Sequence, residues 1–165
     1  MTSQLEKKPE KYQQALDWAE AGQYPKALEF IQSYLEDVPD DAEALNDAGT
    51  ILWCQGRSGE ALPYLERARQ VDADSAAILW NVFEIQLSLD QGTDAIKLLD
   101  DMERLGILQV DILNRAARVL IDSGDLSDAL SILNRSLAME PCQALLEPIV
   151  EVLRHKLGVS QETVV

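Results

Sequence analysis

The sequence predicts an all-α fold, arranged as an array of helix pairs, and three observations support this class. A short segment with a central alanine recurs four times at a constant period of 34 residues. Within a period, apolar residues fall at i, i+3, i+4 and i+7, which places them on one face of a helix. No window shows the sustained alternation of polar and apolar residues that a half-buried strand requires. The central alanines are Ala27, Ala61, Ala95 and Ala129.

The period divides most of the chain into four units, and one further helix follows them. A single unit cannot bury the apolar faces of both its helices, so we expect stability to come from the stacking of neighbouring units. The expected repeats cover about residues 8–41, 42–75, 76–109 and 110–143; a capping helix covers 142–158, and 1–7 and 159–165 are expected to be flexible ends.

Within each unit, a turn separates the first helix from the second. Three units carry a glycine five residues before the central alanine, whereas Asp90 occupies this place in the third unit. We expect Gly92 to serve the turn of that unit. Ser58 follows the turn of the second unit and is expected to cap the helix that begins there. The three turn glycines are Gly22, Gly56 and Gly124.

Small residues recur where the two helices of a unit approach each other. In the second unit these are Ala48, Gly49 and Ala61, and a larger side chain there would overpack the contact by roughly 1–3 kcal/mol. The large apolar residues Leu52 and Leu65 fill the remaining space. Truncation of either leucine to alanine is expected to cost roughly 2–5 kcal/mol.

This combination of period and small residues resembles the tetratricopeptide repeat, whose signature is W-x2-L-G-x2-Y, then A-x3-F, then P. The second unit matches the signature best, and the fourth unit ends on Pro141. The resemblance covers about residues 8–141 and implies a right-handed α-solenoid, or superhelix, of antiparallel helix pairs. The matched residues of the second unit are Leu45-x2-Ala48-Gly49-x2-Leu52, then Ala61-x3-Leu65.

The third unit departs most from this pattern. Phe83 stands where a small residue lets the helices approach, and Gln86 stands where a large apolar residue is usual. Ile107 replaces the proline. We therefore expect the packing or the turn of this unit to be locally irregular.

Each first helix carries a second stripe, rotated from its core stripe by one residue, or roughly 100°. The resemblance implies that this stripe lines a concave groove in which partner segments bind. Trp53 and Trp80 could instead pack between adjacent units as core. Asn46 and Asn114 either hydrogen-bond a peptide backbone or are simply solvated. The candidate groove residues are Tyr12, Leu16, Asn46, Thr50, Trp53, Trp80, Glu84, Leu87, Asn114 and Arg118.

The chain carries 14 Lys and Arg residues against 29 Asp and Glu residues, a formal net charge of −15 at pH 7. Such a surface repels phosphate backbones and anionic lipid headgroups, which argues against nucleic-acid and membrane partners. It favours a protein segment that is basic in balance and carries apolar or aromatic anchors. A run of acids between residues 36 and 47 is interpreted either as a solvated turn and helix start or as a patch that steers a basic partner.

Signals of catalysis, cofactor binding and metal binding are absent from the sequence. His155 is the only histidine and lies on the final helix, with no catalytic constellation around it. Neither a phosphate-binding glycine loop nor a calcium loop is present. Cys54 and Cys142 have no CxxC partners and are expected to be reduced thiols. We therefore expect no enzyme, no cofactor and no metal site, in a cytoplasmic protein without a secretory leader or a membrane span.

The final helix is expected to cap the array with one apolar stripe and a charged outer face. Pro148 either lies in the first turns of this helix or kinks it. We interpret the helix as a solvating cap rather than as a site. The stripe consists of Leu146, Ile149, Val150, Leu153 and Leu157.

The sequence thus predicts a non-enzymatic protein–protein interaction module, or scaffold, that holds a partner segment in a partly aromatic groove. Two alternatives stay open: a self-associating structural scaffold, suggested by aromatic residues of the first unit, and a small export chaperone. A further possibility is a recognition module that works beside an enzyme. The aromatic residues concerned are Tyr12, Trp18, Tyr24 and Tyr34.

Overall fold

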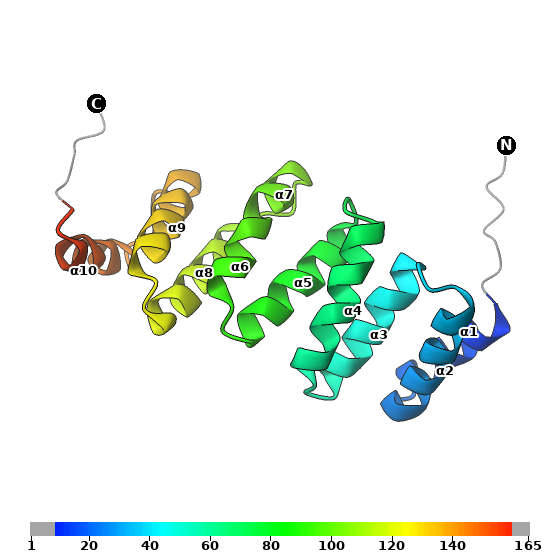
Figure 1. The fold of residues 1–165 in the computed structure, drawn as a ribbon. Coiled ribbons are helices and arrows are strands. Elements are labelled where there is room, and N and C mark those ends of the chain that lie inside the picture. Colours follow the sequence, from blue (N-terminus) through cyan, green and yellow to red (C-terminus); the bar gives the residue numbers. More distant parts are fainter. Residues whose placement is uncertain (1–8, 160–165) are drawn as a thin grey trace, which may run out of the picture. The chain divides into compact units, whose positions relative to one another are not determined.

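The structure is a computed structural model that describes residues 9–159. Every regular element in that part of the chain is a helix, which confirms the predicted all-α class (Figure 1). The chain forms two compact units, Met1–Ile85 and Gln86–Val165. The flexible ends predicted at 1–7 and 159–165 lie outside the described residues, apart from Val159.

The first unit contains two helix pairs and most of a fifth helix (Figure 1). Within each pair, a short turn lets the two helices pack together: α1 with α2, and α3 with α4. Because α3 also packs against α2, the second pair is stacked on the first. The elements are α1 (Glu10–Glu20), α2 (Tyr24–Asp37), α3 (Ala42–Cys54), α4 (Ser58–Val71) and α5 (Ala76–Ser88), of which residues up to Ile85 belong to this unit.

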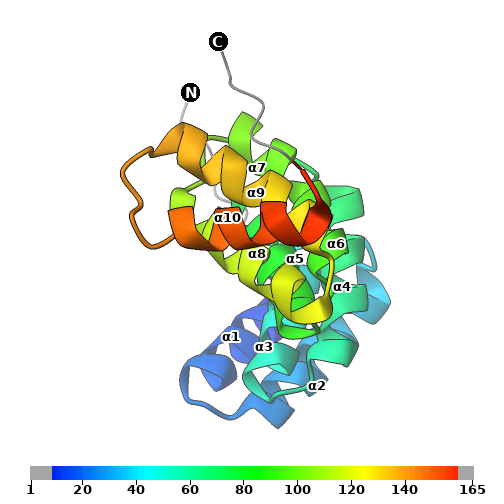
Figure 2. The same cartoon turned by 90° about the vertical axis from the view of Figure 1, so that its left-hand side faces the viewer.

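The second unit contains one regular helix pair, α8 with α9, between an interrupted helix and a terminal one. On one side, α6 packs against α8; on the other, α10 packs against α9, as Figures 1 and 2 both show. The elements are α6 (Gly92–Ala95), the 3-10 segment η1 (Ile96–Leu98), α7 (Leu99–Arg104), α8 (Val110–Ser123), α9 (Leu126–Met139) and α10 (Glu147–Leu157).

The expected irregularity of the third repeat is confirmed in its second helix. Where the other repeats have a single helix of 14 residues, this one is divided into α6, η1 and α7. It ends at Gly106, whose φ is +70°, and the Ile107 amide donates to the Met102 carbonyl over 2.9 Å. The repeat therefore closes its helix with a glycine turn rather than with the usual proline.

The turns inside the repeats have the left-handed backbone that the sequence pattern indicates. Gly56 has a φ of +73°, and in the third repeat Asp90 also has a positive φ, of +57°. The prediction that Gly92 serves this turn is wrong, because Gly92 begins α6 and is buried near Leu120. The prediction that Ser58 caps α4 is also wrong: Ser58 is the first helical residue, and no side chain caps that end.

The close approach predicted at Gly49 is confirmed. A Cβ atom at this position would lie 2.6 Å from Leu65 Cγ and 3.3 Å from the Ala61 carbonyl oxygen. Because a carbon atom cannot come so close to the branch point of a buried leucine, α3 and α4 pack at this distance only with glycine at position 49.

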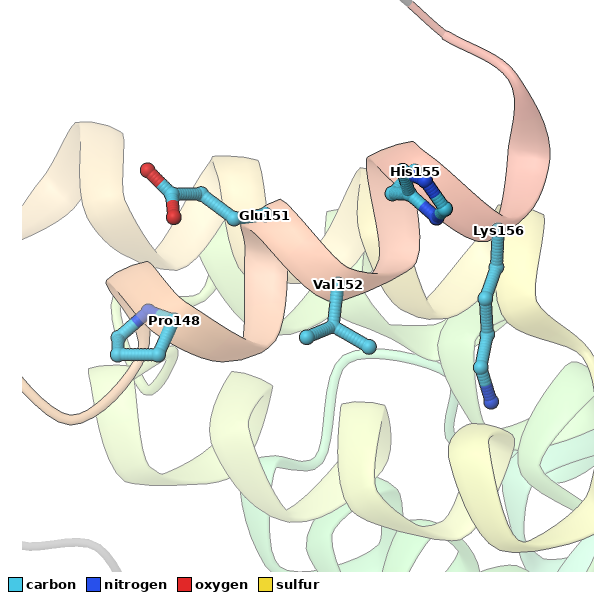
Figure 3. A pocket seen from close by; sticks show the side chains of 5 residues that line it. All are labelled: Pro148, Glu151, Val152, His155 and Lys156. Atoms are coloured by element: carbon cyan, nitrogen blue, oxygen red, sulfur yellow. The ribbon is translucent and has the colours of Figure 1, made fainter.

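The terminal helix α10 covers α9 with only part of its predicted stripe. Pro148 lies in the first turn and does not kink the helix. Val150 and Leu153 are buried, whereas Ile149 is 40% exposed. On the outer face Val152 is 55% exposed (Figure 3), so this face is more apolar than a solvating cap requires. Among the described residues, no helix is long and apolar enough to cross a membrane.

Candidate functional site

Three predicted groove residues form one stripe along α3. Asn46, Thr50 and Trp53 lie at i, i+4 and i+7, which places them on one side of the helix. All three are half-buried. The Thr50 hydroxyl donates to the Asn46 carbonyl oxygen over 2.9 Å, which fixes its orientation.

The next first helix, α5, contributes a residue that the sequence reasoning missed. Asn81 Nδ2 donates to Asn46 Oδ1 over 2.9 Å and lies 3.4 Å from Thr50 Oγ1. The bond fixes both carboxamides and leaves each with one further polar group, the Asn46 Nδ2 donor and the Asn81 Oδ1 acceptor. The signal that could have found Asn81 is its separation of 35 residues from Asn46, one more than the repeat period.

The indoles of Trp53 and Trp80 are both half-buried, so each ring is partly packed and partly on the surface. Trp80 is supported by the fully buried Phe83, with ring centroids 6.5 Å apart and an angle of 39° between the planes. Glu84, one turn beyond Trp80, is also half-buried. We use the name α3–α5 surface for Asn46, Thr50, Trp53, Trp80, Asn81 and Glu84.

Tyr12 is not available to a partner, contrary to the prediction, because its side chain is fully buried. Its hydroxyl donates to Asp47 Oδ2 over 2.5 Å, and the centroid of its ring lies 5.1 Å from the centroid of the Tyr34 ring. Burial first, and then the Asp47 carboxylate, raise the pKa of Tyr12 well above its usual range. Tyr12 and Asp47 are 35 residues apart, so α1 joins α3 with the same offset as α3 joins α5. Leu16, on the same helix, is half-buried.

The remaining predicted groove residues belong to the second unit. Asn114 accepts from Ser136 Oγ over 2.7 Å and donates to Gln143 Oε1 over 2.9 Å. Asn114 therefore ties α8 to the segment that follows α9, a role that neither of the two open alternatives included. Leu87 is buried, whereas Arg118 is exposed.

The run of acids between residues 36 and 47 mostly supports local structure. Asp41 Oδ1 accepts from the amides of Glu43 and Ala44, over 3.1 and 3.0 Å, and so caps α3. Its other oxygen accepts from the Tyr34 hydroxyl over 2.8 Å. Burial first, and then this carboxylate, raise the pKa of Tyr34 to about 12. Asp40 pairs with Arg67 over 2.7 Å.

Other reactive side chains lie apart from this surface or on the exterior. Within residues 9–159, no group of three or more His, Cys, Asp or Glu side chains is placed to hold a metal ion. His155 is exposed on α10. Cys54 and Cys142 are exposed free thiols.

Comparison with known proteins identifies the family. The family model described as "Tetratricopeptide repeat" matches residues 12–78 and 46–107, which together make up more than half of the chain. No curated protein matches the chain.

Solved structures share the fold at low sequence identity. One structure of MamA is 17% identical over 91% of this chain and 84% of that chain, with a TM-score of 0.69. The structure of YrrB, described as "a TPR protein with an unusual peptide-binding site", is 18% identical over 92% of this chain and 78% of that chain, with a TM-score of 0.68. A MamA fragment from Desulfovibrio magneticus RS-1 is 11% identical over 92% and 88%, with a TM-score of 0.67. These similarities agree with the predicted solenoid of antiparallel helix pairs, and the chain belongs to the tetratricopeptide repeat family.

Proposed function

We propose that the chain is a non-enzymatic binding module that holds an extended segment of a partner protein on the α3–α5 surface. The observation that carries this proposal is the hydrogen-bonded pair of carboxamides, Asn81 and Asn46, between two helices that each also carry a half-buried tryptophan. The tetratricopeptide repeat family generally serves protein–protein interaction, and YrrB, a protein of this fold, is described as having a peptide-binding site.

The carboxamide pair fits the backbone of an extended peptide. One peptide group offers a carbonyl acceptor and an N–H donor, and the pair offers the complementary Asn46 Nδ2 donor and Asn81 Oδ1 acceptor. Since both asparagines are already held by their mutual bond, little conformational freedom is lost when a ligand binds. Each new hydrogen bond contributes about 0.5–1.5 kcal/mol net, and this contribution is independent of the ligand's sequence.

Sequence preference would come from the tryptophans and from charge. Trp53 and Trp80 offer large, partly desolvated surfaces of the kind that anchors most of the binding energy in protein interfaces. Glu84 lies on the same surface, and the whole chain has a net charge of −15. We therefore expect the preferred segment to combine apolar or aromatic anchors with positive charge, and its association rate to fall as salt rises.

A random-peptide display library selected on the wild-type chain tests this proposal. The dissociation constants of the selected peptides are then measured for Trp53→Ala, Trp80→Ala and Trp18→Ala. We expect each of the first two substitutions to weaken binding at least about tenfold. Trp18→Ala removes an indole of α1 that does not belong to the α3–α5 surface, so this variant is the matched control, with unchanged binding.

Far-UV circular dichroism separates a lost contact from a lost fold. If Trp53→Ala and Trp80→Ala keep the wild-type helical signal and melting temperature within a few degrees, the loss of affinity belongs to the surface. If both variants unfold, these residues are core and the proposal is wrong. The proposal is equally wrong if all three variants bind the selected peptides like the wild type.

A further inference from the structure

The carboxamide pair on the α3–α5 surface can form its hydrogen bond in two orientations. In the structure, Asn81 Nδ2 donates to Asn46 Oδ1 over 2.9 Å. A carboxamide has an oxygen on one side and an NH₂ group on the other, so turning both side chains over would give a bond from Asn46 to Asn81 instead. The bond between the two residues therefore does not by itself decide which orientation the pair takes.

The two orientations present opposite groups to a ligand. In the observed orientation, the groups left over are an acceptor on α5, Asn81 Oδ1, and a donor on α3, Asn46 Nδ2. With both side chains turned over, α5 would present the donor and α3 the acceptor. The orientation thus decides at which helix the surface receives an N–H group of the ligand and at which helix it receives a carbonyl oxygen.

Thr50 makes the two orientations unequal. Its hydroxyl donates its one proton to the Asn46 carbonyl oxygen over 2.9 Å, so the hydroxyl oxygen can only accept from other groups. Asn81 Nδ2 lies 3.4 Å from this oxygen. The side of Asn81 that faces Thr50 therefore favours the NH₂ group over the carboxamide oxygen.

Turning the pair over would place the carboxamide oxygen of Asn81 against the hydroxyl oxygen of Thr50. To relieve this contact, the Thr50 proton would have to leave an acceptor at 2.9 Å for one at the longer distance of 3.4 Å. The first distance lies within the usual range for a hydroxyl donor, and the second lies beyond it. One hydrogen bond changes an equilibrium by roughly two- to tenfold, so the observed orientation should be favoured by about this factor.

We propose that Thr50 is a positioning residue that sets the orientation of the carboxamide pair. It thereby selects a ligand that offers an N–H donor at α5 and a carbonyl acceptor at α3. The preference for such a ligand rests on the proposed function, whereas the orientation of the pair is a property of the free chain. Asn46, Thr50 and Asn81 all belong to the first unit, so the second unit is not needed for this arrangement.

The free chain gives the first test, through the exchange of side-chain NH₂ protons with water in ¹⁵N–¹H spectra. In the wild type we expect the Asn81 protons to exchange more slowly than the Asn46 protons, because only Asn81 Nδ2 donates within the pair. Thr50→Val keeps the shape of the side chain but removes the hydroxyl, so the difference between the two residues should shrink. Thr50→Ser restores the hydroxyl and should restore the difference.

A ligand gives the second test. The probes are a display-selected peptide and its retro-inverso analogue, in which reversed order and D-residues keep the side chains in place while every N–H and carbonyl group changes places. The measured quantity is the ratio of the two dissociation constants. From the wild type to Thr50→Val, the preference for the selected peptide should fall by roughly two- to tenfold, because the pair can then turn over for the analogue. Thr50→Ser should keep the wild-type ratio.

Ser123→Ala is the matched control. The Ser123 hydroxyl makes the same kind of bond on α8, to the Val119 carbonyl oxygen four residues earlier over 3.0 Å, and lies outside the α3–α5 surface. Its removal should leave the NH₂ exchange and the ratio of dissociation constants unchanged. Far-UV circular dichroism should give the wild-type helical signal for all three variants, since Thr50 is only half-buried and Ser123 is exposed.

The two readouts separate this proposal from the proposed function. If Trp53→Ala and Trp80→Ala weaken binding but Thr50→Val keeps the wild-type ratio and exchange rates, the peptide binds at the surface and Thr50 does not set the pair. The proposal is also wrong if Thr50→Ser behaves like Thr50→Val, or if the Asn46 protons exchange more slowly than the Asn81 protons in the wild type. A chain that binds no peptide contradicts the proposed function and, with it, the ligand preference.

Discussion

The substitution Gly49→Ala tests the packing between α3 and α4 most sharply. In an isolated helix this change would add about 1 kcal/mol of stability, because alanine has the higher helix propensity. In this structure the new methyl group would lie 2.6 Å from Leu65 Cγ and 2.9 Å from Leu65 Cδ2. Leu65 is fully buried and the nearer atom is its branch point, so the whole side chain or the helix must move.

Overpacking of this kind costs roughly 1–3 kcal/mol and more when backbone must shift. Here the Ala61 carbonyl oxygen also lies 3.3 Å from the new methyl group, which limits movement in that direction. We therefore take the upper half of the range and subtract the gain in helix propensity. The expected net effect is a loss of about 1–2 kcal/mol in the free energy of unfolding.

Urea denaturation followed by circular dichroism measures this loss, and the chain offers a matched control. Gly59 is the second residue of α4, where an added Cβ would meet no atom within 4 Å, so Gly59→Ala should stabilise the protein by up to about 0.5 kcal/mol. In a Leu65→Ala background the clash is gone, and Gly49→Ala should then cost little, which a double-mutant cycle detects. If Gly49→Ala stabilises the wild type as Gly59→Ala does, the packing argument is refuted.

Three further predictions follow from single positions. Asp90→Gly should raise the free energy of unfolding by about 0.5 kcal/mol. Asp90 has a φ of +57°, so glycine removes a steric cost of about 1–2 kcal/mol, but it also makes the unfolded chain more flexible, which costs about 0.5–1 kcal/mol. A lower urea midpoint would contradict this prediction. Tyr12→Phe should cost about 1–3 kcal/mol, because Asp47 loses its buried donor, and the cost should vanish when Asp47 is already alanine. Stability should fall as pH rises from about 10 to about 12, because an unfolded tyrosine ionises near 10 whereas Tyr34 stays protonated to about 12; guanidinium midpoints across this range should show a shallower fall for Tyr34→Phe.

The fold follows from local patterns in the sequence, and so it could be predicted closely. The period of the central alanines, the small residue Gly49 and the missing proline at Ile107 each act on a neighbouring helix or turn, and each had the expected consequence. The prediction that Gly92 serves the turn of the third repeat was wrong, because the left-handed residue there is Asp90, which holds the position that glycine has in the other repeats. The predicted cap at Ser58 was wrong, because α4 begins at Ser58 itself and no side chain caps that end.

The candidate site was less predictable, because it depends on how successive first helices lie against each other. The prediction of a groove-facing stripe treats each first helix alone. It placed Tyr12 in the groove, although the Tyr12 hydroxyl reaches the next repeat and donates a hydrogen bond to Asp47. The same offset brings Asn81 to Asn46, which no single-helix pattern indicates. Asn114 donates a hydrogen bond to Gln143, which lies in an irregular segment without a periodic sequence pattern.

The indole N–H signals of the tryptophans report directly on binding at the α3–α5 surface. The chain has three tryptophans, and Trp53 and Trp80 lie on the proposed surface, whereas Trp18 lies on α1 and lines a separate hollow with Phe30 of α2. A ¹⁵N–¹H correlation spectrum shows one indole N–H signal for each, and single Trp→Phe variants assign them. When a display-selected peptide is added, we expect the Trp53 and Trp80 signals to move together, with one shared dissociation constant, while the Trp18 signal stays in place. Movement of the Trp18 signal alone, or saturation by the peptide without movement of Trp53 and Trp80, would contradict binding at the α3–α5 surface.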